Sequence, residues 1–142
     1  MTAIDVTDVS FAYADQPVIE EISLDIDEGE FLGLVGPNGS GKTTLLELMV
    51  GLRQPDSGTI TLFGEPAHSF GDGERVGYVP QDVASAKGEM PITVTEVVRM
   101  GRYPHRLFRR FRTEDRDSVD DALERVGISD LADRRVARLS GG

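Results

Sequence analysis

The sequence predicts an α/β fold built around a phosphate-binding loop, and three observations support this prediction. Residues 36–43 are Gly-Pro-Asn-Gly-Ser-Gly-Lys-Thr and match the pattern GxxxxGK[ST]. The apolar run 31–35 before them is typical of a strand that is buried on both faces. The segment 42–50 after them carries the leucines of a helix that ends at Gly51. A strand, a glycine-rich loop and a helix in this order indicate nucleotide binding.

The residues around this loop predict further β-structure. Apolar and polar residues alternate over 22–27 and, more weakly, over 4–11, which predicts two antiparallel strands before the loop. After the helix, the turn sequence Pro-Asp-Ser-Gly at 55–58 precedes a strand predicted over 59–63. Residues 76–79 indicate another short, buried strand. We therefore expect the first part of the chain to be rich in β-structure.

The second part of the chain predicts helices. Thr93 and Glu96 have the spacing of a capping box, which predicts a helix over 94–100. A second helix is expected to begin near Thr113 and to end at Gly127, with acidic residues in its first turns. Its apolar residues follow the helical spacing i, i+3, i+4, i+7 and are Val119, Ala122, Leu123 and Val126.

Charge divides the chain unevenly. The net charge is −10, but residues 1–98 hold 17 acidic against 4 basic residues, whereas residues 99–142 hold 8 acidic residues against 11 arginines. An acidic surface of this kind is typical of proteins adapted to high salt, where self-repulsion is screened. It is equally typical of an ordinary acidic enzyme encoded by a GC-rich genome. Both explanations stay open.

Composition excludes several classes of site. The chain has no cysteine, which rules out disulfides, thiolate metal sites and a cysteine nucleophile within it. No apolar run approaches the roughly 20 residues of a membrane-spanning helix, and the N-terminus lacks the pattern of a signal peptide, so a cytoplasmic protein is expected. His68 and His105 have no neighbouring ligand residues and are expected to be surface residues rather than zinc ligands.

The residue types in the loop indicate what each position does. Gly36, Gly39 and Gly41 allow main-chain N–H groups to approach phosphate oxygens at the N-terminus of a helix. Lys42 is predicted to reach the β- and γ-phosphates of a nucleotide, and the Thr43 hydroxyl to ligate the Mg²⁺ that bridges them. The other candidate nucleotide contacts in the loop region are Pro37, Asn38, Ser40 and Thr44.

Three further motifs resemble the ATP-binding subunits of ATP-binding cassette (ABC) transporters. Tyr13 ends the sequence Phe-Ala-Tyr, Gln81 follows Tyr-Val-Pro, and residues 139–142, Leu-Ser-Gly-Gly, match the start of the LSGGQ signature of that family. The resemblance covers the whole chain. It implies a P-loop NTPase core of the ABC type with an N-terminal antiparallel β-subdomain and an α-helical subdomain, and it divides the partial domain 1–142 into 1–81 and 82–142.

The resemblance also implies functional roles. Tyr13 is expected to stack on adenine, and Gln81 to ligate Mg²⁺ and to act with Lys42 in catalysis. Ser140, Gly141 and Gly142 are expected to contact the γ-phosphate of ATP held by a second, head-to-tail subunit. In the family, the Walker B aspartate, the catalytic glutamate and the switch histidine follow the signature. The chain is therefore expected to be a fragment, truncated before the Walker B strand, that binds ATP without turnover and exposes apolar surface.

The cargo of such a transporter has more than one reading. Residues 90–103 resemble importers of zinc and manganese, which favours divalent metal uptake. Residues 101–105, Gly-Arg-Tyr-Pro-His, are equally similar to importers of iron-siderophores, haem and cobalamin. A cytosolic ABC ATPase of DNA repair or translation is a further alternative. The 57 residues between Gln81 and Leu139 leave no room for the coiled-coil insertion of the repair proteins.

The family resemblance implies partners as well. These are a second ATPase subunit, integral membrane permease subunits and, indirectly, an extracytoplasmic substrate-binding protein, which would place the chain on the cytoplasmic face of the membrane. A basic segment between residues 99 and 116 is expected to meet the permease or anionic lipid. Nucleic acid is not an expected partner, because the net charge is negative and no recognition module is present. The arginines of that segment are Arg99, Arg102, Arg106, Arg109, Arg110, Arg112 and Arg116.

Overall fold

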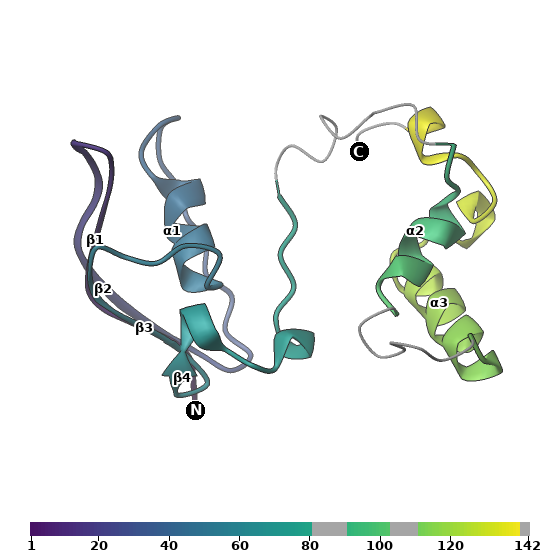
Figure 1. Ribbon diagram of the computed structural model, residues 1–142, viewed down its shortest axis with the longest axis horizontal. Coiled ribbons are helices and arrows are strands. Elements are labelled where there is room, and N and C mark those ends of the chain that lie inside the picture. Colours follow the sequence, from purple (N-terminus) through teal and green to yellow (C-terminus); the bar gives the residue numbers. More distant parts are fainter. Residues whose placement is uncertain (81–90, 103–110, 140–142) are drawn as a thin grey trace. The chain divides into compact units, whose positions relative to one another are not determined.

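The computed structural model describes residues 1–80, 91–102 and 111–139. The chain forms two compact units, Met1–Tyr78 and Val79–Gly142, each with its own hydrophobic core (Figure 1). In the described ranges, no helix is both long enough and apolar enough to cross a membrane.

The first unit contains an antiparallel sheet of four strands. These are β1 (Thr2–Tyr13), β2 (Gln16–Asp27), β3 (Ser57–Leu62) and the short β4 (Glu65–Pro66), in the order β2-β1-β3-β4. The long hairpin of β1 and β2 confirms the two antiparallel strands predicted before the loop. Strand β3 confirms the strand predicted over 59–63, with its start two residues earlier.

The strand register explains which face of the sheet is buried. Val6 in β1 lies opposite Leu24 in β2 and Ile60 in β3, so apolar side chains of three strands share one face. Helix α1 (Lys42–Met49) packs on this face (Figure 1). The buried core comprises Val6, Val9, Ile19, Leu45, Leu48, Met49, Ile60, Leu62 and Ala67.

Helix α1 ends where the sequence predicts. Gly51 has φ of 77°, in the left-handed region that terminates helices, and an added Cβ there would lie 2.1 Å from the carbonyl oxygen of Ala67. A side chain at position 51 would therefore be incompatible both with the turn and with the packing of the chain after β4.

Two predicted strands are absent. Residues 31–35 and 76–79 form no strand, and Phe31 and Val35 are 94% and 95% exposed rather than buried. Both predictions were wrong for the same physical reason. A strand needs a hydrogen-bonded neighbour, and no segment in the described part of the chain pairs with either run. Apolar composition alone cannot supply that neighbour.

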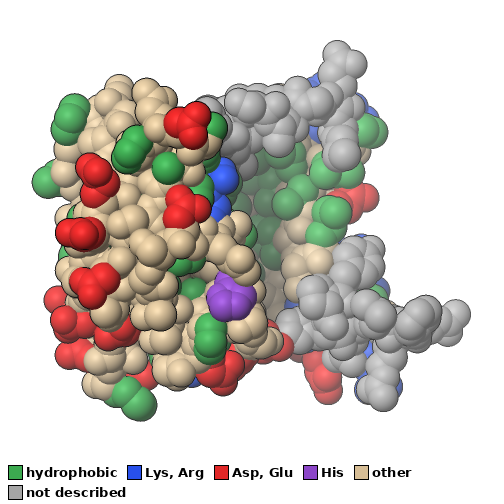
Figure 2. Space-filling model, turned by 60° about the vertical axis from the view of Figure 1, so that its left-hand side comes forward, with side chains coloured by type: hydrophobic (Ala, Val, Ile, Leu, Met, Phe, Trp, Pro, Cys, Tyr) green, Lys and Arg blue, Asp and Glu red, His purple; other side chains and the backbone are tan. Residues whose placement is uncertain are grey.

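The opposite face of the sheet is acidic. Asp5 in β1 lies directly across from Asp25 in β2, so two like charges face each other. Figure 2 shows acidic side chains spread over one face of the Met1–Tyr78 unit. Residues 1–78 contain 14 acidic and 3 basic residues, and their self-repulsion opposes folding of this unit.

The second unit packs two short helices together. Helix α2 (Val94–Met100) and helix α3 (Thr113–Arg125) share a small core in which Val94, Val119 and Leu123 are buried. The predicted capping box is confirmed, because the Glu96 N–H donates to the Thr93 hydroxyl (3.3 Å) and the Thr93 N–H donates to the Glu96 carboxylate (2.7 Å).

A buried carboxylate ties the two helices of this unit together. Asp115 in the first turn of α3 is fully buried, and one of its oxygens accepts hydrogen bonds from Nε (3.1 Å) and Nη2 (3.0 Å) of Arg102, just after α2. Its other oxygen accepts the Arg112 N–H at 2.8 Å. The sequence predicts an acidic residue at this place in the helix, and the structure adds that Asp115 is buried and joins α3 to the end of α2.

Two arginines of the predicted docking segment have internal contacts instead. Arg102 pairs with Asp115, and the Arg99 guanidinium lies 4.3 Å from the centre of the Phe111 ring. Arg106, Arg109 and Arg110 lie outside the described residues.

The segment 92–95 pairs with the chain after α3. The Val94 N–H donates to the carbonyl oxygen of Arg134, and the Val136 N–H donates to the carbonyl oxygen of Ile92, both at 3.0 Å.

Candidate nucleotide-binding site

The predicted phosphate-binding loop leads directly into α1. Gly39 and Gly41 have φ of 82° and 86°, values at which glycine has no steric cost. At Gly41 a side chain would also clash, since an added Cβ would lie 2.9 Å from Cδ1 of Ile19. No side chain caps α1 at this end. The first N–H groups of the helix, with the positive end of its dipole, can therefore serve an anion.

Lys42 is held within the loop by the loop's own oxygens. Its ammonium donates to the carbonyl oxygens of Gly36 (2.8 Å) and Pro37 (2.6 Å) and contacts the Ser40 hydroxyl at 3.3 Å. Asn38, between these residues, is exposed. The structure thus brings a positive charge, uncapped helical N–H groups and a tight glycine loop to one place, which is the donor set that polyphosphate requires.

The two threonines at the start of α1 differ in their surroundings. Thr43 is exposed, so its hydroxyl is accessible to a hydrated Mg²⁺. Thr44 is buried, and its hydroxyl lies 3.3 Å from the Tyr13 hydroxyl. The side chain of Thr44, which the sequence suggested as a nucleotide contact, therefore anchors another candidate residue of the site.

Tyr13 lies beside the start of α1 although it is 31 positions from Thr44 in the sequence. It ends β1, and its ring meets the Phe11 ring edge-on, with centres 5.0 Å apart and planes at 90°. The residue remains 43% exposed. An aromatic ring held by a perpendicular neighbour and at its hydroxyl, with open surface next to a phosphate-binding loop, fits the stacking of a nucleobase.

Four other predicted site residues cannot be placed in this geometry. Gln81, Ser140, Gly141 and Gly142 lie outside the described residues. Where the structure is described, no group of three or more His, Asp or Glu side chains is arranged to hold a metal ion.

His68 borders a cavity of about 340 Å³ at the C-terminal end of α1, and no residue of the phosphate-binding loop lines that cavity.

Sequence reasoning missed the residues that surround Tyr13. The Arg53 guanidinium lies 5.1 Å from the centre of the Tyr13 ring, and its Nε donates to the Glu47 carboxylate. The hydrogen bond to Glu47 raises the pKa of Arg53 above its ordinary value. No sequence pattern links positions 13, 47 and 53, because the contact depends on how β1 and α1 pack.

A comparison with protein families decides the membership of the chain. The sequence profile of the family described as ABC transporter matches residues 19–142. The chain belongs to the ABC transporter family. This confirms the resemblance drawn from Tyr13, Gln81 and the partial signature at 139–142.

Individual ABC transporter proteins extend the match. The high-affinity zinc uptake system ATP-binding protein ZnuC of Bacillus subtilis is 40% identical over 143 residues, which cover 100% of this chain and 61% of ZnuC. The ferric enterobactin transport ATP-binding protein FepC of Escherichia coli is 40% identical over 138 residues, covering 94% of this chain and 50% of FepC. The chain therefore spans between half and about three fifths of these two relatives.

A solved ABC transporter structure supports the fold. It is described as a metal-chelate type transporter in an inward-facing conformation, and it superposes with a TM-score of 0.78 at 28% identity, over 99% of this chain and 52% of that chain. This confirms the predicted α/β fold of the ABC type, with an antiparallel β part and a helical part.

Proposed function

We propose that the chain is the ATP-binding part of an ABC importer subunit that couples ATP hydrolysis to uptake of a divalent metal such as zinc or manganese. The observation that carries the ATP-binding part of this proposal is the set of donors around Lys42. A cation fixed by loop carbonyls lies beside an uncapped helix N-terminus, with Tyr13 packed against the same helix. These groups fit the polyphosphate and the base of one nucleotide.

Each residue of the site then has a distinct role. The loop N–H groups and Lys42 bind the phosphates, and Lys42 stabilises the charge that develops on the transferring phosphoryl group. The Thr43 hydroxyl and Gln81 would hold Mg²⁺, which when bound neutralises phosphate charge. Tyr13 stacks on adenine while Thr44 fixes the tyrosine. Ser140, Gly141 and Gly142 contact ATP on a second subunit.

The proposed role requires partners. A second ATPase subunit would complete each ATP site head to tail, and permease subunits would convert closure of the pair into transport, with an extracytoplasmic substrate-binding protein acting indirectly. This places the chain at the cytoplasmic face of the membrane, as a single partial ABC domain over residues 1–142. We propose that these 142 residues bind ATP without turnover, because none of them is assigned as the carboxylate that orients water.

The cargo proposal rests on similarity alone. Both the zinc relative and the ferric enterobactin relative are 40% identical to this chain, but the match to the zinc protein covers all of the chain whereas the other covers 94%. The difference favours divalent metal import only slightly. Import of an iron-siderophore is the second candidate because of the similarity to the ferric enterobactin protein. The residues of the ATP site do not decide between the two cargoes, since an ATPase subunit does not itself contact the cargo.

Nucleotide binding is tested by titrating the chain with ATP, with and without Mg²⁺, in a calorimeter. Lys42→Ala should weaken ATP binding at least tenfold under both conditions. Thr43→Val should weaken it only when Mg²⁺ is present, whereas Thr59→Val, an exposed change on β3, serves as the matched control. Equal affinities of the Lys42→Ala variant and the unaltered chain would refute ATP binding at this loop.

The cargo is tested with the complete transporter reconstituted in vesicles. ATP-dependent accumulation of Zn²⁺ or Mn²⁺, lost in the Lys42→Ala variant, would support the proposal. Accumulation of a ferric siderophore with no uptake of either metal ion would establish the alternative. Each substrate is measured on the same preparation so that protein quality cannot explain the difference.

A further inference from the structure

The Tyr13 ring is restrained from three directions. The Phe11 ring meets it edge-on, the Thr44 hydroxyl lies 3.3 Å from its hydroxyl, and the Arg53 guanidinium carbon lies 5.1 Å from the ring centre. The first contact sets Phe11 perpendicular to the ring, and the second holds the hydroxyl at its tip. A guanidinium over a tyrosine face adds an electrostatic attraction that depends on the tilt of the ring.

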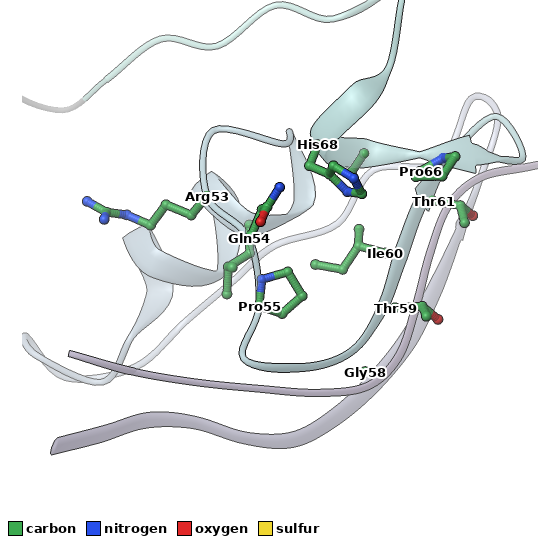
Figure 3. Close-up of a pocket in the computed structure, with 11 residues that line it drawn as sticks. Arg53, Gln54, Pro55, Gly58, Thr59, Ile60, Thr61, Pro66 and His68 are labelled. Carbon is green, nitrogen blue, oxygen red and sulfur yellow. The ribbon is translucent and has the colours of Figure 1, made fainter. Parts of the chain in front are cut away.

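Arg53 is itself held in place by α1. Its Nε donates to the Glu47 carboxylate, and Glu47 belongs to the helix whose N-terminus forms the phosphate site. In Figure 3 the Arg53 side chain extends away from Ile60 and His68, two other residues that line the cavity there. Its guanidinium is held by Glu47 of the helix and lies over the Tyr13 ring.

The charge distribution of this unit makes the position of Arg53 unusual. Residues 1–78 contain only three basic residues, Lys42, Arg53 and Arg75, against 14 acidic ones. Two of the three lie at the candidate site, with Lys42 in the phosphate-binding loop and Arg53 at the tyrosine. The charge of Arg53 is offset by the Glu47 carboxylate with which it is paired, so its contribution to the site comes through its contact with the Tyr13 ring.

We propose that Arg53, anchored by Glu47, is a positioning residue that fixes the plane of the Tyr13 ring for stacking on the nucleobase. The inference rests on the proposed nucleotide site and adds a residue to it. Because Arg53 acts through the ring, it contributes to binding of the base and not of the phosphates. The 43% of Tyr13 that stays exposed is the surface that the base covers.

The same unit provides a matched control. The Arg75 guanidinium lies 3.4 Å from the centre of the Phe63 ring, and its Nη2 is 3.7 Å from a Glu28 carboxylate oxygen. This arginine therefore has an aromatic and an acidic partner, as Arg53 has. It has no contact with Tyr13 or with the phosphate-binding loop among the interactions of the described residues. Arg75→Met removes a similar interaction without altering the site.

The test compares two ligands on the full chain. Mg²⁺·ATP has a base, whereas Mg²⁺·tripolyphosphate has only the phosphates. In Arg53→Met, which keeps the aliphatic stem, the affinity for Mg²⁺·ATP should fall about fivefold and the affinity for tripolyphosphate should stay within about twofold. Arg53→Lys, which keeps a cation, should recover part of the loss. Arg75→Met should leave both affinities unchanged.

A second variant covers the case in which Arg53→Met folds poorly. Glu47→Gln keeps a hydrogen-bond acceptor but removes the charge that anchors Arg53, and it should weaken ATP binding in the same selective way, to a smaller extent. The inference is overturned if the folded variants bind ATP as the unaltered chain does, or if both ligands weaken equally. Failure of the proposed nucleotide site is a separate result, in which the unaltered chain binds neither ligand.

Discussion

The two units of this chain are stabilised in different ways. Met1–Tyr78 buries nine apolar residues between a sheet and a helix, and it does so despite a strongly acidic composition. Val79–Gly142 buries three apolar residues in its described part and relies on the Arg102–Asp115 pair, a capping box and backbone pairing of distant segments. The first unit should therefore respond most to loss of apolar volume, and the second to loss of single polar groups.

The largest effect is expected from a cavity in the first unit. Leu48→Ala removes a fully buried side chain at the centre of the core and should lower the free energy of unfolding of this unit by roughly 3–4 kcal/mol. Leu46→Ala on the same helix removes a side chain that is 40% exposed and should cost less than about 1 kcal/mol. Urea denaturation measures both, and similar losses would contradict the assigned burial.

The next effect concerns the second unit. Asp115→Ala leaves Arg102 and the Arg112 N–H without their acceptor, and it should lower the stability of this unit by roughly 2–3 kcal/mol. This expected loss of stability is smaller than for a fully buried pair because the Arg102 side chain is 30% exposed. Asp117→Ala, an exposed change in the same helix, is the control.

Hydrogen exchange of individual amides separates the two units in that experiment. Faster exchange in α2 and α3 with unchanged protection of β1–β3 is the expected pattern for Asp115→Ala. Equal loss of protection in both units would show that they unfold together, and the comparison between them would then fail.

Salt should separate the units by their charge. Raising NaCl from about 0.1 M to about 1 M shortens the screening length from roughly 10 Å to 3 Å, which weakens repulsion between neighbours such as Asp5 and Asp25. The melting temperature of Met1–Tyr78 should rise by a few degrees. That of Val79–Gly142, where 11 acidic and 12 basic residues nearly balance, should change less. Equal melting temperatures of Met1–Tyr78 at the two salt concentrations would count against adaptation to high salt.

The smallest effect is a pH dependence confined to α2. The hydrogen bond from the Thr93 N–H, followed by that from its hydroxyl, lowers the pKa of Glu96 below its ordinary 4.5. A carboxylate with a lowered pKa stabilises the fold above that ordinary value, and the contribution disappears as the pH falls through the lowered pKa. The protection of amides at the start of α2, measured relative to their intrinsic exchange rates at each pH, should therefore fall on acidification, and Glu96→Gln should remove this dependence.

Local chemistry explains which predictions succeeded. The capping box and the end of α1 at Gly51 are set by residues a few positions apart, so the sequence alone is enough for them. The strand predicted over residues 31–35 is absent because a strand depends on a hydrogen-bonded neighbour, which the pattern of apolar residues does not reveal. The phosphate-binding loop was recognisable from its own pattern, whereas the contact of Arg53 with Tyr13 joins residues 40 positions apart.

The burial of Asp115 was unpredictable for a related reason. Acidic residues near the start of a helix are usually exposed, and Glu114 and Asp117 are. Only the packing of α3 against the end of α2 selects Asp115 from this group and brings Arg102 to it. The identity of a buried charge is thus decided by tertiary structure rather than by helix position.

The way in which Lys42 is held has a consequence for the entropy of binding. A free lysine side chain loses roughly 1.5–2 kcal/mol of conformational freedom when it is fixed in one orientation. Here the carbonyl oxygens of Gly36 and Pro37 already fix the ammonium within the loop. An arriving phosphate therefore meets an ordered cation, and most of the cost of ordering it belongs to folding and not to the encounter.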